Sequence, residues 1–166
     1  MNYWFVFIDA DALPVATVTE EEFLDRCCGA STNEVPLFGV HHPCHALKMQ
    51  PHTEYPGAFE TNTNSRAGVT EDDDTSMYYQ GCLWGGRVPE VLDMIDELDS
   101  RVEEDLSNDV IAVWHDESQL NKFYSEVKED VHLLGPQYAY PEVFQDHCNF
   151  EPKIVHLAKD NSAYQI

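Results

Sequence analysis

The apolar residues of the chain fall into short runs that predict β-strands. The first run covers residues 3–8, YWFVFI, and lacks polar–apolar alternation, which is typical of a strand buried on both faces. The second covers residues 36–41, PLFGVH. A third covers residues 78–83 and is closed by Gly85-Gly86. Two further strands are predicted at residues 131–134 and 154–157.

Other segments carry apolar residues at helical spacing. A helix beginning at Pro89 is predicted to bury one stripe, formed by Val91, Leu92, Ile95, Leu98, Val102 and Leu106. A second helix, following residues 110–118, carries Leu120, Phe123, Tyr124 and Val127. Thr19 followed by Glu22 is typical of a capping box and predicts a short helix with Phe23, Leu24 and Cys27 inward. From the histidine-rich turn at residues 41–45 to about residue 75, the chain lacks periodicity, which predicts a long loop.

Strands and helices in a chain of 166 residues predict one α/β domain with a mixed sheet, residues 1–166, whose polar end, 159–166, is expected to be mobile. No stretch approaches the roughly 18 apolar residues of a membrane span, and the start lacks the basic flank of a signal peptide. We therefore expect a soluble, cytoplasmic protein. The five cysteines form no recognisable framework, so no disulfides are predicted.

The net charge narrows the choice of partners. The chain has 31 acidic and 9 basic side chains, a formal charge of −22, which repels nucleic acid and anionic lipid. Most of these charges are interpreted as solvated surface. A phosphorylated substrate would still need a metal cation to offset carboxylate repulsion.

The acidic pair Asp9 and Asp11 directly follows the first predicted strand. Two carboxylates near one point can hold a hard divalent cation, and ligands of open α/β sheets gather at the carboxyl ends of strands. The spacing alone leaves a polar strand-to-loop junction as the alternative, because the tripeptide arises by chance in so acidic a chain.

The tetrapeptide Trp114-His115-Asp116-Glu117 combines an aromatic surface, an imidazole and two carboxylates. Aromatic rings stack on sugar rings, and a carboxylate stabilises an oxocarbenium-like transition state or attacks the anomeric carbon. The alternative is helix capping, since Asp116 followed by Gln119 also fits a capping box. The two interpretations are compatible because a carboxylate at a helix N-terminus stays ionised.

A turn rich in histidine offers another candidate chemistry. His41, His42, Cys44 and His45 are four zinc-ligand types within five residues, but such crowding rarely suits one tetrahedral ion. No P-loop, dinucleotide-binding, serine-hydrolase or zinc-protease motif is present.

Residues 111–122, IAVWHDESQLNK, are nearly identical to AVWHDESHLNK, the signature of glycosyltransferase family 6, the family of the histo-blood-group A and B transferases. Three other segments follow in the family's order: Phe7–Asp11, Phe38–Pro43, and Tyr78-Tyr79 with Gly85-Gly86. The chain is therefore identified as a member of that family.

The resemblance implies a GT-A-like nucleotide-diphospho-sugar transferase fold, here expected to lack part of the N-terminal uridine-binding region. It also implies transfer of a hexose (galactose, N-acetylgalactosamine or glucose) from a UDP-sugar to a glycan hydroxyl, with retention and with Mn²⁺ or another divalent cation. A homo-oligomer is compatible with it. The alternatives are a non-catalytic glycan- or metal-binding module and a weak UDP-sugar hydrolase.

The resemblance also implies residue roles. Asp9 and Asp11 would bind the cation, and Glu117 would act as nucleophile or as a front-face stabiliser, with Asp116 beside it. Donor-binding residues would be Asp9, Ala10, Asp11, Gln80, Gly81, Cys82, His115, Asp116 and Lys159. Acceptor-binding residues would be His42, Trp114 and Glu117. Gln119 replaces the family's usual histidine, and Gln165 lies where a tail arginine is expected, which predicts a looser grip on the diphosphate.

Overall fold

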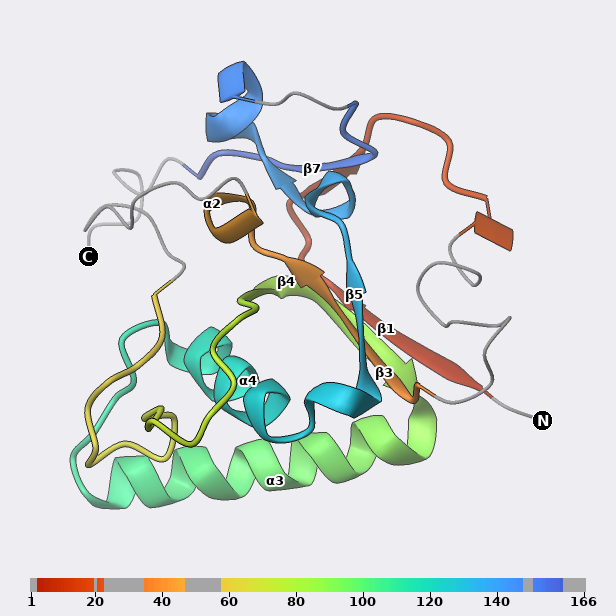
Figure 1. The fold of residues 1–166 in the computed structure, drawn as a ribbon. Helices are drawn as coiled ribbons and strands as arrows, with labels where there is room; N and C mark the ends of the chain where they lie inside the picture. Colours follow the sequence, from red (N-terminus) through yellow and green to blue (C-terminus); the bar gives the residue numbers. More distant parts are fainter. Residues whose placement is uncertain (1–2, 20, 23–34, 47–57, 148–150, 160–166) are drawn as a thin grey trace.

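A computed structural model describes residues 3–19, 21–22, 35–46, 58–147 and 151–159 (Figure 1). Its larger sheet has the order β1 (Trp4–Ile8), β4 (Tyr79–Arg87), β3 (Leu37–His41) and β5 (Val131–Leu134). β4 pairs antiparallel with β1 and β3, whereas β3 and β5 are parallel. The mixed sheet and these strand positions confirm the prediction.

A second sheet joins the two ends of the chain. Its order is β2 (Ala12–Pro14), β7 (Ile154–His156) and β6 (Tyr140–Pro141), with β2–β7 antiparallel and β6–β7 parallel. Three short 3₁₀ helices flank these strands: η1 (Lys128–Asp130), η2 (Pro136–Tyr138) and η3 (Glu142–His147). The C-terminal strand thus lies beside the segment that follows Asp11.

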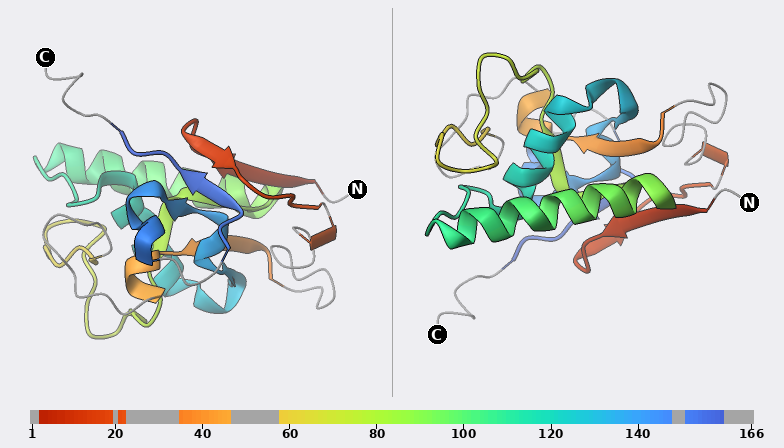
Figure 2. Two further views of the ribbon diagram at one scale, coloured as in Figure 1. Left: turned by 90° about the horizontal axis from the view of Figure 1, so that it is seen from above. Right: turned by 90° about the horizontal axis from the view of Figure 1, so that it is seen from below.

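Helices α3 (Val88–Ser107) and α4 (His115–Glu126) pack on one face of the larger sheet, and a short α2 (Pro43–Ala46) follows β3 (Figures 1 and 2). The helix-side core consists of Leu37, Tyr79, Val91, Met94, Leu120, Tyr124 and Val131. The opposite core, against the smaller sheet, consists of Phe38, Val40, Leu83, Leu134, Tyr138, Ala139 and Ile154. The larger sheet is therefore the middle of three layers.

Several smaller predictions have outcomes in this part of the chain. Thr19 Oγ1 accepts a hydrogen bond from the Glu22 N–H at 3.1 Å, as a capping box requires. The described stretch 58–78 contains no helix or strand, as predicted. No helix among the described residues has both the length and the apolar composition of a membrane span. The predictions for Phe23, Leu24 and Cys27, for Gln165 and for the tail beyond Lys159 lie outside the described residues.

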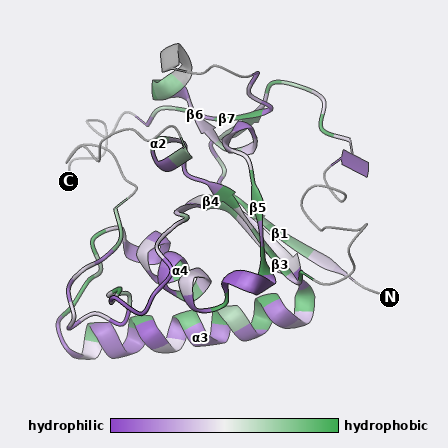
Figure 3. Ribbon diagram, viewed as in Figure 1, coloured by the Kyte–Doolittle hydropathy of each residue, from purple (hydrophilic) through white to green (hydrophobic). Residues whose placement is uncertain are grey.

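The predicted apolar stripe of α3 is partly wrong. Leu92, Ile95 and Leu106 are exposed, and the buried residues of the helix are Val91, Met94, Arg101 and Asp105. Figure 3 shows apolar and polar residues alternating along this helix. Arg101 pairs with Glu97 and Glu126 at 2.8 and 2.7 Å, and Asp105 accepts a 2.6 Å hydrogen bond from Ser65. Because both polar side chains have partners, they take inward positions that hydropathy assigned to apolar residues.

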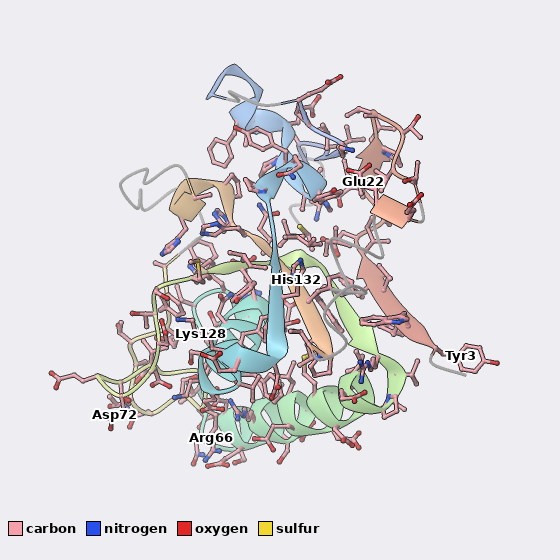
Figure 4. All side chains as sticks on the ribbon, turned by 45° about the vertical axis from the view of Figure 1, so that its right-hand side comes forward. Tyr3, Glu22, Arg66, Asp72, Lys128 and His132 are labelled. Atoms are coloured by element: carbon pink, nitrogen blue, oxygen red, sulfur yellow. The ribbon has the colours of Figure 1, made fainter. Side chains whose placement is uncertain are left out.

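The prediction that β1 is buried on both faces is wrong. β1 is the edge of the larger sheet, and Phe5, Val6 and Ile8 are 39%, 43% and 43% exposed. Tyr3, just before the strand, projects away from the molecule (Figure 4). A continuous apolar run does not distinguish a central strand from an edge strand whose outer neighbour is absent among the described residues.

The two glycines predicted to close the third strand instead lie inside it, since β4 continues to Arg87. A Cβ atom on Gly85 would lie 2.2 Å from the Phe5 carbonyl oxygen and 2.7 Å from the Phe38 ring. A Cβ atom on Gly86 would lie 2.3 Å from the Pro36 carbonyl oxygen. The glycines therefore allow β1 and β3 to approach β4 from both sides.

Gly85→Ala should lower the free energy of unfolding by about 2–3 kcal/mol, because the added methyl group overlaps backbone and ring atoms that cannot both move away. Urea unfolding measures the effect. Ser100→Ala, on the exposed side of α3, is the matched control and should change stability by less than about 0.5 kcal/mol. Equal stability of the Gly85 variant and the native chain would contradict this packing.

Candidate active site

Several segments converge on two adjoining cavities. They include the turn after β1, the residue between β3 and α2, the middle of β4, the first turn of α4, the junction of β6 with η3, and β7 with the residues that follow it. The larger cavity, of about 350 Å³, is lined by residues that include Asp9, Asp11, His42, Gln80, Cys82, Glu117, His156 and Lys159. The smaller, of about 260 Å³, is lined by Asp9, Gly81, Cys82, Trp114, Asp116 and Glu117. Three residues, Asp9, Cys82 and Glu117, line both.

An irregularity in the pairing of β4 with β3 frees backbone groups in the middle of β4 for contacts in the site. Gly39 of β3 pairs with Trp84, but the next residue, Val40, pairs with Gln80, so residues 81–83 have no partner on β3. A β-bulge of this kind leaves backbone groups outside the ladder. The Gly81 N–H is one of them, and it donates to Glu117 Oε2 at 2.8 Å.

The Asn121 side chain clamps α4 onto the same strand. Its Oδ1 accepts from the Tyr79 N–H at 2.7 Å, and its Nδ2 donates to the Tyr79 carbonyl at 2.8 Å and to the Glu117 carbonyl at 2.9 Å. A Cβ atom on Gly81 would lie 3.1 Å from the Glu117 Cβ. The missing side chain at Gly81 therefore lets β4 pass directly under Glu117.

The Glu117 carboxylate is partly buried and accepts two hydrogen bonds. Besides the Gly81 bond, Oε1 accepts from the Tyr78 hydroxyl at 3.0 Å. Burial raises the pKa of Glu117 to about 7, against the effect of these two donors, and the neighbouring Asp116 and Asp9 raise it further. The group thus changes charge near neutral pH.

The acidic pair lines the larger cavity together with Glu117. Ligand atoms of Asp9, Asp11 and His156 all lie within 4.8 Å of one another. Burial raises the pKa of Asp9. Burial also opposes ionisation of Asp11, but the hydrogen bond and charge of Lys159, 3.1 Å from Oδ2, outweigh it and lower the Asp11 pKa. The other oxygen, Asp11 Oδ1, is buried and has no hydrogen-bond partner in the part of the chain that the structure describes. A hard divalent cation fits this donor set.

The other predicted residues are divided between the two cavities. His42, Gln80 and Lys159 line the larger cavity, Gly81, Trp114 and Asp116 line the smaller, and Cys82 lines both. Ala10 is exposed between the two aspartates and lines neither. His115 is exposed and lines a different, largely apolar cavity of about 240 Å³, which Asp116 and Gln119 also border.

The capping box predicted for Asp116 and Gln119 is wrong. The residue that precedes α4 is Trp114, which makes no side-chain cap bond, and Gln119 donates from Nε2 to Asp105 Oδ2 at 2.8 Å. The side-chain amide of Gln119, which the pattern paired with Asp116, therefore binds the buried Asp105 carboxylate instead. The Asp116 side chain lies in the first helical turn at the rim of the smaller cavity.

The histidine-rich turn does not form a metal site among the described residues. His41 Nε2 and His45 Nδ1 lie 3.0 Å apart, while the buried His42 accepts the Cys44 N–H on Nδ1 at 3.2 Å. Burial lowers the pKa of His42 to about 4, so its ring is neutral. In the described part of the chain, the group with three convergent metal-ligand types is the one at Asp9, and the zinc hypothesis gains no support.

Two residues of the site were missed by sequence reasoning. Tyr78, which the sequence placed in an apolar strand and in a segment shared with the family but gave no role in the site, donates to Glu117. His156, in the strand IVH, lies beside the acidic pair. The sequence does show His156 at the end of an otherwise apolar strand. Without the order of the strands in the sheet, however, it does not show which residues lie beside this histidine.

A mixed α/β fold in which a carboxylate at a helix start and an acidic pair at a strand end line one cavity suits a glycosyltransferase. Comparison with known proteins identifies the family. Residues 29–165 match glycosyltransferase family 6, and the chain belongs to this family.

Individual relatives show how much of a longer protein the chain covers. It is 28% identical over 163 residues to the O-antigen biosynthesis glycosyltransferase WbnI of Escherichia coli, an alignment of 98% of this chain and 62% of that protein. It is 33% identical over 106 residues to the histo-blood group ABO system transferase 1 of Rattus norvegicus, covering 64% of this chain and 29% of the relative. The chain thus spans less than two thirds of these relatives.

The raised pKa of Glu117 has a consequence for stability. Between pH 4.5 and about 7 the folded chain keeps a proton on Glu117 that the unfolded chain releases, so this residue lowers stability as the pH rises. Glu117→Gln should therefore gain about 2–3 kcal/mol relative to the native chain between pH 5 and pH 8. Urea unfolding at both pH values measures the gain, and comparing the two cancels the lost hydrogen bond.

Glu103→Gln, on the exposed face of α3, is the control and should track the native chain at both pH values. Parallel pH dependences of the Glu117 variant and the native chain would show that Glu117 ionises normally.

Proposed function

We propose that the chain transfers a hexose from a UDP-sugar to a glycan hydroxyl with retention of the anomeric configuration. The observation that carries the proposal is that the Glu117 carboxylate, held by Tyr78 and Gly81, lines the same cavity as Asp9 and Asp11. Relatives named as an O-antigen glycosyltransferase and as a blood-group transferase support the substrate class.

The donor would lie along the larger cavity. A divalent cation, manganese first, would be held by Asp9 and Asp11 and would offset the negative charge of the diphosphate. Lys159 supplies a positive charge at the same place. Gln80, Gly81 and Cys82 border the path between the acidic pair and Glu117, which suits contact with the sugar.

Glu117 would act on the anomeric carbon by one of two routes. In a double displacement, a Glu117 oxygen attacks the anomeric carbon. The bond between this carbon and the diphosphate oxygen breaks, and UDP leaves with the electron pair. The acceptor oxygen then displaces Glu117, and the hydroxyl proton passes to UDP. In the front-face route, Glu117 stabilises the cationic sugar while the acceptor attacks from the side of the departing UDP. Both routes retain configuration and need Glu117 ionised.

The acceptor would enter beside Trp114 and His42. Trp114 borders the smaller cavity, and its indole Nε1 is buried and has no hydrogen-bond partner among the residues that the structure describes. An aromatic ring suits stacking on a sugar, and a free N–H suits a sugar oxygen. The neutral His42 ring, at the wall of the larger cavity, can exchange a hydrogen bond with a hydroxyl.

UDP release from a panel of UDP-sugars, with and without Mn²⁺ and a glycan acceptor, tests the proposal. We expect Mn²⁺-dependent release with at least one donor. Glu117→Gln should reduce turnover at least about 100-fold because it removes the reacting carboxylate, and Asp11→Ala should abolish the Mn²⁺ response. The control Glu103→Gln should retain native turnover.

No turnover with any donor, together with no Mn²⁺-dependent UDP binding, would contradict the proposal and favour a glycan- or metal-binding module. Release of UDP with equal rates in the presence and absence of every acceptor would instead indicate a UDP-sugar hydrolase.

Tyr78→Phe should move the acid limb of the kcat/KM profile to higher pH by about one unit, because Glu117 loses a hydrogen bond that stabilises its ionised form. The rate above this limb should change little. Tyr124→Phe is the matched control, since that buried hydroxyl bonds the Phe38 carbonyl away from the site. An unshifted limb in the Tyr78 variant would contradict the assignment of this limb to Glu117.

A further inference from the structure

The smaller sheet brings His156 to the acidic pair. In the antiparallel pairing of β2 with β7, His156 lies opposite Ala12, the residue after Asp11. On its other side, β7 pairs with β6, where His156 lies opposite Pro141. The Leu157 N–H also donates to the Asp11 carbonyl at 3.1 Å. Backbone bonds on both sides of β7 thus fix His156 beside the Asp-x-Asp turn.

The His156 side chain is buried, and its hydrogen bonding is incomplete. The residue is 8% exposed and borders the larger cavity. Nδ1 lies 3.4 Å from Asp11 Oδ1, beyond the length of a good hydrogen bond. Nε2 and Asp11 Oδ1 are both buried and have no hydrogen-bond partner among the described residues. Buried polar atoms normally have partners, so the unpaired Asp11 Oδ1 beside His156 Nδ1 points to a ligand at this place.

The spacing of the donor atoms suits one cation. Two ligand atoms about 2.1–2.3 Å from an ion are about 3 Å apart at a right angle and about 4.4 Å apart on opposite sides. The 3.4 Å separation of His156 Nδ1 and Asp11 Oδ1 is close to the first value. The 4.8 Å limit that encloses the ligand atoms of Asp9, Asp11 and His156 is close to the second.

Lys159 leaves this arrangement open. Its ammonium contacts Asp11 Oδ2 at 3.1 Å, whereas the oxygen that faces His156 is Oδ1. The aspartate can therefore keep its ion pair with Lys159 on one oxygen and offer the other oxygen to a cation.

We propose that His156 is a third protein ligand of the divalent cation, bound through an imidazole nitrogen together with Asp9 and Asp11. The proposal rests on the proposed function, whose cation it concerns, and adds a residue from the opposite end of the chain. A neutral imidazole strengthens binding without adding negative charge near the diphosphate. Nitrogen ligands also favour transition metals over Mg²⁺, so His156 sets the preference of the site for manganese.

Pulsed electron paramagnetic resonance of the full chain loaded with one equivalent of Mn²⁺ tests the ligand directly. A coordinated histidine nitrogen modulates the electron spin echo, and the modulation changes when the chain is labelled with ¹⁵N. We expect this modulation in the native chain and its loss in His156→Ala and His156→Gln. Mn²⁺ affinity, measured by calorimetry, should fall at least about tenfold, and the selectivity for Mn²⁺ over Mg²⁺ should decrease.

His132→Gln is the matched control, because His132 is a partly buried histidine on β5, away from the lining of the cavity (Figure 4). It should retain the nitrogen modulation and the native affinity. The ¹⁵N experiment on the unsubstituted chain keeps the test decisive if a His156 variant fails to fold.

Mn²⁺ binding that depends on Asp11 but shows no nitrogen modulation would overturn the role of His156 and leave the proposed function intact. Nitrogen modulation that persists in both His156 variants would also overturn it. Absence of Mn²⁺ binding to the native chain, with or without UDP, would overturn both.

Discussion

The hydrogen bonds between β4 and the start of α4 are the constraint on which the site depends. The bulge at residues 81–83 releases the Gly81 N–H from the ladder, and this group binds the Glu117 side chain. Asn121 bonds both backbone groups of Tyr79 one helical turn later. The helix is therefore held against the strand at two points, and the carboxylate cannot turn away from the cavity without breaking a backbone hydrogen bond.

This placement sets the electrostatics of the site. Asp9, Asp11, Asp116 and Glu117 border two adjoining cavities. Among the described residues that line these cavities, Lys159 is the one with a basic Lys or Arg side chain. Carboxylates crowded together repel one another, which destabilises the folded chain unless protons or cations reduce the charge. Burial raises the pKa values of Asp9 and Glu117, and the repulsion of neighbouring carboxylates raises them further. The same excess of negative charge that opposes folding attracts a cation.

Sequence patterns predicted the positions of helices and strands better than the neighbours and the burial of these elements. Apolar runs located β1, β3, β4, β5 and β7 but missed the short strands β2 and β6, and the family signature singled out Glu117, which lines the cavity of Asp9 and Asp11. The runs did not show that β1 is an edge, because exposure depends on which strands are neighbours. Hydropathy misplaced the inner face of α3, because Arg101 and Asp105 are buried through partners distant in sequence. His156 escaped notice for the same reason, since only the order of the smaller sheet places it near Asp11.

The exposed edge of β1 couples the solution behaviour of the protein to salt. Phe5, Val6 and Ile8 present apolar surface along a strand whose outer backbone edge can pair with another chain. A formal charge of −22 keeps two copies apart over a Debye length of about 10 Å at 0.1 M salt and about 3 Å at 1 M. Salt therefore weakens the repulsion and leaves the attraction between apolar edges in place. We therefore expect the colloidal stability of this chain to be greatest in dilute buffer, where its attraction for a divalent cation is also strongest.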